Sequence, residues 1–213
     1  MEKKTKAIGL LSGGLDSIVA ARLILEQGIE VEALNFVTAF CTCTSKGSGC
    51  LASRKAADQL GIPLKVVDIS EEILDVVKNP KFGYGSGMNP CMDCRIFTFK
   101  KAKEYMRESG AAFVFTGEVL GQRPMSQRRE AMNIIERESG LKGYLLRPLC
   151  AKLFKPTLAE EEGIVDRNKL LVITGRSRKG QMALAKKFDI RDYPCSSGGC
   201  LLTDKGFARR MKD

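Results

Sequence analysis

The feature that most constrains the fold lies near the start of the chain, in the stretch KAIGLLSGGLDS from Lys6 to Ser17. An apolar run of strand length, residues 7–11, leads directly into six small or polar residues, and apolar residues then recur at helical spacing up to Leu25. Glycines at such a strand-to-helix turn let the backbone close around an anion, and the first N–H groups of the helix point at it. Asp16 is placed to hold a metal ion that bridges phosphates. The stretch therefore predicts a phosphate site, in preference to an ordinary turn with a Ser or Asp helix cap.

The six residues SGGLDS resemble the pyrophosphate loop (PP-loop) of the N-type ATP pyrophosphatases. Enzymes of this family adenylate an oxygen of an acceptor and release pyrophosphate, and a nitrogen or sulfur nucleophile then displaces AMP. No Gly-Lys-Ser/Thr ending of the Walker type occurs in the chain, which argues against a γ-phosphate hydrolase. The resemblance implies ATP and Mg²⁺, held by Ser12, Gly13, Gly14, Asp16 and Ser17.

Strand patterns alternate with helical patterns along most of the chain, which predicts an α/β fold: a doubly wound, mostly parallel sheet with helices on both faces. The resemblance implies the same fold, that of the adenine nucleotide alpha hydrolases. Expected strands are 7–11, 29–37, 64–69, 111–115, 144–146 and, at an edge, 170–173. Expected helices begin near Ile18, Leu51, Glu71, Cys91, Gln127, Lys155 and Arg176, with a short basic one at the end.

The chain length of 213 residues suits one α/β domain with a small appendage. We expect a PP-loop domain over residues 1–150 and a basic extension over residues 151–213 that packs on it and supplies Cys195 and Cys200. Ligands of such sheets bind beyond the carboxyl ends of the strands. The turn at Ser12 ends the first strand and a cysteine-containing loop ends the second, so both are expected at one edge of the sheet.

The net charge of +10, from 35 Lys and Arg against 25 Asp and Glu, favours a polyanionic partner, most simply nucleic acid. A solvated basic surface is the alternative. The candidate nucleic-acid contacts are Arg123, Arg128, Arg176, Arg178 and Lys179. Absence of an apolar stretch of spanning length and of an opening signal peptide predicts a soluble, cytoplasmic protein without a membrane partner. The sequence has no His, which excludes serine-hydrolase triads and His-based acid–base chemistry.

A second resemblance is more discriminating and covers roughly residues 6–149. The blocks that carry it, matching those of tRNA 4-thiouridine synthetase, are Thr116-Gly117-Glu118, Leu120-Gly121-Gln122, Ser126-Gln127 and Leu146-Arg147-Pro148-Leu149. It implies that Thr116, Gly117 and Gln122 lie at the ATP site and that the acceptor is a tRNA uridine. The synthetase also has an RNA-binding region and a persulfide-handling domain that this sequence lacks. A sulfur donor is therefore expected, together with a partner chain or a second copy, as in a homodimer.

The eight cysteines of a chain expected in the cytosol are typical of metal ligands or reactive thiols. Cys91 and Cys94 lie three residues apart at a helix start, a spacing that can ligate one metal. The helix N-terminus and Arg95 are expected to lower the pKa of both thiols. Cys195 and Cys200 form a second pair across a Gly-Gly turn.

Three of these thiols resemble the 4Fe-4S ligands of the iron–sulfur-dependent tRNA thiolation enzymes, in which the fourth iron stays open to carry the sulfur nucleophile. Cys200 is preferred as the third ligand because Gly198-Gly199 permits close approach. Cys195 is the alternative third ligand. Structural zinc on all four Cys and direct persulfide chemistry are the alternatives. The candidate catalytic residues are Asp16, Cys91, Cys94 and Cys200.

The remaining cysteines carry weaker signals. Cys41, Cys43 and Cys50 share a loop of small residues and can bind metal, relay sulfur or be incidental. Cys150 follows an apolar run and is expected to be a buried structural thiol.

The sequence thus predicts an ATP-dependent sulfurtransferase that adenylates a nucleoside oxygen, in tRNA uridine, and replaces it with sulfur. Three alternatives stay open: a PP-loop ligase that forms an amide or nitrile with Cys-bound zinc, a sulfurtransferase for a small molecule, and a non-catalytic, zinc-stabilised RNA-binding module.

Overall fold

A computed structural model describes residues 5–41, 51–194 and 200–212. Three of the cysteines considered above, Cys43, Cys50 and Cys195, lie outside these residues. Among the described residues, no helix is both long and apolar enough to cross a membrane.

The described chain forms a five-stranded sheet in the order β3-β2-β1-β4-β5, and all neighbouring strands run parallel. The strands are β1 (Lys6–Leu10), β2 (Glu30–Val37), β3 (Leu64–Asp68), β4 (Phe113–Thr116) and β5 (Leu145–Leu146). The α-helices are α1 (Leu15–Leu25), α2 (Leu51–Leu60), α3 (Glu72–Lys78), α4 (Cys91–Glu108), α5 (Arg129–Ser139), α6 (Leu158–Glu161), α7 (Lys179–Lys187) and α8 (Lys205–Lys212). Short 3₁₀ helices are η1 (Ala151–Leu153), η2 (Arg167–Lys169) and η3 (Leu201–Thr203). The doubly wound fold expected from the sequence is confirmed.

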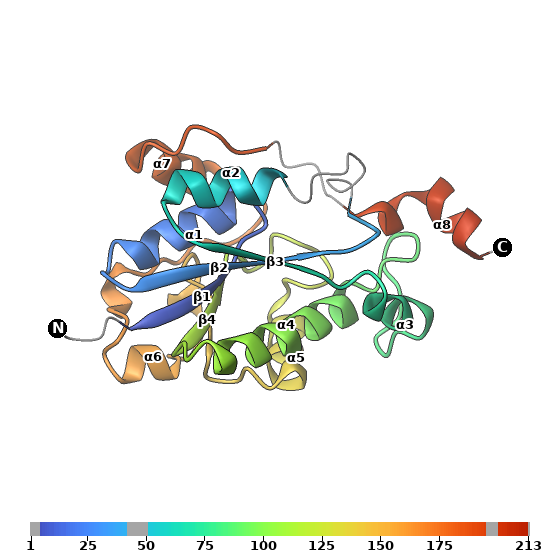
Figure 1. The fold of residues 1–213 in the computed structure, drawn as a ribbon, viewed down its shortest axis with the longest axis horizontal. Coiled ribbons are helices and arrows are strands. Elements are labelled where there is room, and N and C mark those ends of the chain that lie inside the picture. Colours follow the sequence, from blue (N-terminus) through green and yellow to red (C-terminus); the bar gives the residue numbers. More distant parts are fainter. Residues whose placement is uncertain (1–4, 42–50, 195–199, 213) are drawn as a thin grey trace.

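Alternation along the strands divides the core into two layers. Ala7 and Phe113 face a cluster that includes residues of α1, α2 and α7, whereas Ile8 and Val114 face a cluster that includes residues of α4 and α5. Figure 1 shows the same arrangement, with α1, α2 and α7 on one face of the sheet and α4 and α5 on the other. Successive side chains of a strand point to opposite faces, so a strand covered on both sides reads as a continuous apolar run.

Strand order reverses at β1, since β2 and β3 lie on one side of it and β4 and β5 on the other. The crevice beyond the carboxyl ends of β1 and β4 is the usual ligand site of such a sheet. The turn after β1 and the segment after β4 contain the residues that the sequence assigns to ATP.

The last third of the chain contributes to two clusters. Ala185 of α7 and Ile190 join the apolar core beneath α1. Leu202 and Ala208 of the final segment instead join α3 in a smaller cluster, next to α3 in Figure 1. The division into residues 1–150 and 151–213 stays a prediction.

The edge strand expected over residues 170–173 does not form. Leu171 and Ile173 donate backbone hydrogen bonds to the carbonyls of Pro148 and Leu149, at 3.0 and 2.8 Å. Their partner segment turns into η1 at Ala151, so no extended strand continues beside them to form a ladder. Thr174 alone pairs with Leu120, in an isolated parallel bridge.

Glycine at position 13 is required by a close backbone approach. Its φ is +78°, and a Cβ there would lie 2.4 Å from the carbonyl carbon of Ala52 in α2. Gly28 has nearly the same φ, +77°, but no atom within 4 Å of its Cβ position. The two glycines share the left-handed conformation and differ in available space.

This difference yields a prediction. Gly28→Ala should cost only the left-handed strain, about 1–2 kcal/mol in the free energy of unfolding. Gly13→Ala should cost roughly 3 kcal/mol or more, because α2 must also move away from the loop. Urea unfolding of both variants measures the difference, and equal losses would show that the contact with Ala52 is unimportant.

Candidate functional site

The turn after β1 has the geometry expected of an anion site. Gly14 is the N-cap of α1 and provides no side-chain cap, while its carbonyl accepts from the backbone N–H of Ser17 at 3.0 Å. The Ser17 hydroxyl donates to the same carbonyl at 2.8 Å and lies 3.2 Å from the Ser12 hydroxyl. The ordinary Ser or Asp cap is therefore not what this turn uses, and the helix start is left to face a ligand.

Asp16 has one carboxylate oxygen suited to a cation. Its Oδ2 accepts from the side-chain amide of Gln122 at 3.0 Å. Its Oδ1 is shielded from solvent and has no hydrogen-bond partner in the structure. A shielded carboxylate oxygen is costly without a partner, and carboxylate oxygens are preferred Mg²⁺ ligands. The residue therefore fits the metal role predicted for it.

The segment after β4, residues 116–123, packs directly on this turn. A Cβ at Gly117 would lie 2.5 Å from the carbonyl carbon of Asp16 and from the amide nitrogen of Ser17, so only glycine fits. Thr116 is buried at the end of β4. The structure thus brings the predicted residues of the β1 turn together with Gly117 and Gln122.

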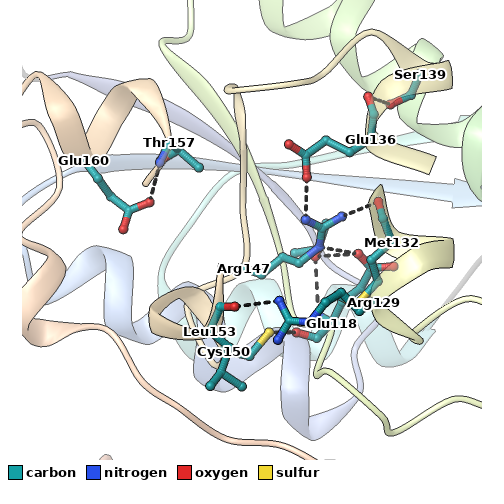
Figure 2. A network of polar contacts seen from close by, with 11 residues as sticks. Glu118, Arg129, Met132, Glu136, Ser139, Arg147, Cys150, Leu153, Thr157 and Glu160 are labelled. Carbon is teal, nitrogen blue, oxygen red and sulfur yellow. Dashed lines mark hydrogen bonds and ion pairs between the residues drawn. The ribbon is translucent and has the colours of Figure 1, made fainter. Parts of the chain in front are cut away.

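A buried ion-pair network, which the sequence analysis does not predict, holds the same segment. Glu118 and Arg147 are 4% exposed, and the Arg147 Nε lies 3.1 Å from the Glu118 Oε2. Arg147 also donates to Glu136 at 2.7 Å and to the carbonyl of Met132 at 3.4 Å. Figure 2 shows its guanidinium between the two carboxylates. The detectable signal was a charged residue inside the apolar run Leu146–Leu149.

The electrostatics of this network favour a charged Arg147. Burial acts to lower the pKa of Arg147, but the carboxylates of Glu118 and Glu136 outweigh it and raise the pKa. Removal of one partner from such a pair leaves a buried, uncompensated charge. The network therefore locks β4, β5 and α5 together behind the segment 116–123.

The second carboxylate oxygen of Glu118 faces α4. Glu118 Oε1 lies 3.3 Å from the Nε of Arg95, one residue after Cys94. The Arg95 guanidinium also stacks over the Phe99 ring, 5.6 Å from its centroid. One buried residue thus links the segment beside the ATP loop to the helix that carries the thiols.

Four thiols gather at the start of α4. Cys91 and Cys94 come from the first turn of the helix, Cys200 from the final segment, and Cys41 from the residues that directly follow β2. Cys94 and Cys200 are each close enough to Cys91 and Cys41 for charge on one thiol to affect the other. Cys94 and Cys200 also pack against the small apolar cluster around Leu202. Cys91, Cys94 and Cys200 thus lie in one region of the fold, and their role as ligands stays a prediction. Cys41, for which the sequence leaves metal binding, sulfur relay and an incidental role open, lies in the same region.

The expected lowering of the thiol pKa values is wrong. Burial raises the pKa of Cys94 to about 11, and the nearby Arg95 only partly offsets it. Burial likewise raises the pKa of Cys91, against the lowering effects of Arg95, of a hydrogen bond with Asn89 and of Arg123. Desolvation of a thiolate outweighs the helix terminus and the cations here. The thiols are therefore protonated at neutral pH unless a bound metal ion displaces the protons.

Cys150 is a buried structural thiol, as expected. It is fully buried and donates to the carbonyl of Glu118 at 3.3 Å. Burial raises the pKa of Cys150 to about 11.

The predicted nucleic-acid residues fall into two groups. Arg123 is exposed and close enough to Cys91 to act on its charge, and Arg128 is the exposed N-cap of α5. The remaining three, Arg176, Arg178 and Lys179, precede or begin α7. The bridge between Leu120 and Thr174 brings this second group beside the segment 116–123. Their role as nucleic-acid contacts stays a prediction.

Metal binding by the thiols also stays a prediction. Among the described side chains, no three Cys, Asp or Glu residues are arranged to hold one metal ion. Cys195, one of the four candidate ligands, lies outside the described residues.

The family model for the thiamine biosynthesis protein ThiI matches residues 3–155, most of the chain. The chain belongs to the ThiI family. This confirms the PP-loop family expected from Ser12–Ser17.

Similar sequences include two proteins named tRNA-specific 2-thiouridylase MnmA. The one from Stutzerimonas stutzeri is 28% identical over 222 aligned positions, covering 99% of this chain and 55% of the relative. The one from Syntrophotalea carbinolica is 36% identical over 123 residues, covering 54% of this chain and 35% of the relative. The chain thus spans about half the length, or less, of these relatives.

Two solved structures share the fold. A 4-thiouridine synthetase in complex with RNA and ATP has a TM-score of 0.53 at 24% identity, covering 98% of this chain and 50% of the other. A predicted subunit of tRNA methyltransferase from Methanocaldococcus jannaschii has a TM-score of 0.56 at 13% identity, covering 97% and 86%. At these identities the likeness supports the fold alone.

The opposing effects of burial and Arg95 on the thiols give a prediction for the metal-free protein. Arg95→Gln removes the cation that favours the thiolate, so the pKa of Cys91 and Cys94 should rise further. Since only the thiolate reacts, alkylation of both should slow by several-fold at any pH below their pKa values. Mass spectrometry of iodoacetamide-treated protein over a pH series measures the rates.

Arg107→Gln, at the exposed far end of α4, is the matched control and should leave both rates unchanged. Equal rates in Arg95→Gln and the native protein would contradict the electrostatic role of Arg95.

Proposed function

We propose that the chain is an ATP-dependent sulfurtransferase that adenylates a nucleoside oxygen, in tRNA uridine, and replaces it with sulfur. The observation that carries the proposal is a direct link between two sites. Within residues 116–123, Gln122 contacts Asp16 of the ATP loop, while Glu118 contacts Arg95 beside the thiols. A nucleotide site and a sulfur site joined by one short segment suit a reaction in which activation and sulfur attack occur at the same carbon.

The first step uses the turn after β1. Ser12, Ser17 and the backbone at the start of α1 bind the pyrophosphate part of ATP, and the backbone approach at Gly117 fixes the turn. Asp16 would hold Mg²⁺ through its Oδ1, where the metal neutralises phosphate charge. The acceptor oxygen attacks the α-phosphorus and pyrophosphate leaves. The chain lacks His, so positioning and charge neutralisation account for catalysis.

The second step uses the thiols. Cys91, Cys94 and Cys200 would hold a 4Fe-4S cluster, which when bound supplies the sulfur nucleophile. The chemistry of the donor set supports this, because thiolates are the ligands of such clusters and Cys94 and Cys200 pack against the apolar cluster around Leu202. The three thiols are not arranged around a single metal ion in the described structure, so cluster binding would have to bring them together. The sulfur nucleophile would displace AMP from the adenylated carbon. A sulfur donor must replace the transferred atom in each cycle.

The acceptor is proposed from charge and from the relatives. The two sequence relatives are named tRNA-specific thiouridylases, and both cover the PP-loop region. Arg123, Arg128, Arg176, Arg178 and Lys179 offer cations near the segment 116–123, where phosphate contacts would give affinity without reading sequence. A partner chain or a second copy would supply further RNA contacts.

Two variants separate the two steps, and each serves as the control of the other. Asp16→Asn should lower tRNA-dependent pyrophosphate release roughly 100-fold or more, because a preorganised charge is lost, while iron and sulfide content stays native. Cys91→Ala should retain pyrophosphate release but lose iron, sulfide and thiolated product. Asp58→Asn, exposed on α2, should change neither step.

These measurements are made on anaerobically purified protein with bulk tRNA. Full thiolation by Cys91→Ala would refute the sulfur role. Zinc in place of iron would favour the ligase or the structural-zinc alternative, and absence of pyrophosphate release would favour the binding module.

A further inference from the structure

Cys41 and Cys200 lie opposite each other in an isolated antiparallel bridge. The backbone N–H of Leu201 donates to the carbonyl of Phe40 at 2.8 Å, so the hydrogen bond flanks the cysteine pair and does not join its members. This pattern marks a non-hydrogen-bonded antiparallel pair, in which the Cα atoms are about 4.5 Å apart and the side chains are closest. A disulfide needs a Cα separation of about 4.4–6.8 Å. A pair of this type therefore falls within the Cα range that a disulfide needs.

Packing holds both sides of the pair in place. Phe40 is 5% exposed and makes an edge-on contact with Phe207 of α8, with 6.3 Å between ring centroids. On the other side, Leu202 is 3% exposed and its carbonyl accepts from the backbone N–H of Met88 at 2.9 Å. The Cys41 sulfur itself lies 3.4 Å from the backbone nitrogen of Thr38. Packing and hydrogen bonds thus hold the backbone on both sides of the pair.

Both thiols are also accessible. Cys41 and Cys200 are partly exposed, in contrast to the fully buried Cys150. Cys91 and Cys94 are close enough to Cys200 for electrostatic interaction. Both belong to helix α4, however, and neither forms a backbone bridge with Cys200 in the described chain.

We propose that Cys41 and Cys200 form a reversible disulfide, a redox modification site that removes Cys200 from the thiol site. The oxidant is a small disulfide of the glutathione class. The Cys200 thiolate attacks it and expels one small thiol, and the Cys41 thiolate then attacks the Cys200 sulfur and expels the second. Two S–H bonds are replaced by one S–S bond, and the two electrons and two protons leave with the two released thiols.

The consequence for activity rests on the proposed function. With Cys200 in a disulfide, only Cys91 and Cys94 of the proposed cluster ligands remain, so the oxidised protein cannot assemble the sulfur site. Reduction by a dithiol restores it.

Disulfide mapping of the full-length, metal-free protein tests the inference. Tryptic cleavage leaves Cys41 with Cys43 on one peptide and Cys195 with Cys200 on another. The double variant Cys43→Ser/Cys195→Ser should therefore keep the link between these peptides after treatment with oxidised glutathione. Cys41→Ser should lose it completely, and dithiothreitol should reverse it in the double variant. Loss of the link in the double variant, or a link from Cys200 to Cys91 or Cys94, would overturn the inference.

A second measurement separates this inference from the proposed function. Cys41→Ser should bind iron and sulfide as the native protein does, but after treatment with oxidised glutathione it should keep a glutathione mixed disulfide on Cys200 in place of the protein disulfide, as intact-mass measurement shows. Loss of iron from Cys41→Ser would make Cys41 a ligand and overturn its assignment as the redox partner. If no variant or native protein binds iron, the proposed function fails while the disulfide map still stands.

Discussion

The buried carboxylate of Glu118 is the constraint on which the site depends. A buried charge must be compensated, and Glu118 meets Arg147 on one side and Arg95 on the other. Arg147 in turn pairs with Glu136, which ties β5 and α5 to the end of β4. This buried network fixes the backbone of the segment 116–123, and with it the residues that contact this segment.

That segment touches both halves of the proposed reaction centre. Gly117 lies against the first turn of α1, and Gln122 orients one oxygen of Asp16 so that the other stays available. Arg123 reaches Cys91 electrostatically, and Leu120 pairs with Thr174 ahead of the basic residues of α7. A nucleotide loop on β1 and thiols on α4, far apart in the sequence, are thereby joined by eight residues. Desolvation keeps these thiols protonated, which suits a site completed only by metal binding.

Much of the fold follows from local patterns. The helix predicted at residues 51–60 has those bounds in the structure, because Gly61 and Pro63 end an amphipathic run. The strands were placed within two residues, since apolar runs buried on both faces are unambiguous between glycine-rich turns. The turn over Ser12–Ser17 follows from the sequence for the same reason, because its geometry depends on neighbours in the chain.

The features that the sequence does not predict depend on contacts between residues far apart in the chain. Residues 170–173 have strand composition, but their partner segment bends into η1. Local reasoning assigned a low pKa to Cys94 from the helix terminus, whereas the thiol is desolvated by segments remote in sequence. The pairings of Glu118 with Arg147 and of Cys41 with Cys200 likewise require the folded sheet. Local chemistry thus predicts the elements, and only their packing shows which charges and thiols meet.

The most direct measurement is a crystal structure of the anaerobic protein with Mg²⁺ and an ATP analogue that has a methylene group between the α- and β-phosphorus atoms. We expect the β- and γ-phosphates at the start of α1, Mg²⁺ on Asp16, and the α-phosphorus turned toward the side where Cys91, Cys94 and Cys200 lie. An analogue bound away from α1, or an α-phosphorus separated from these thiols by the packed segment 116–123, would contradict it.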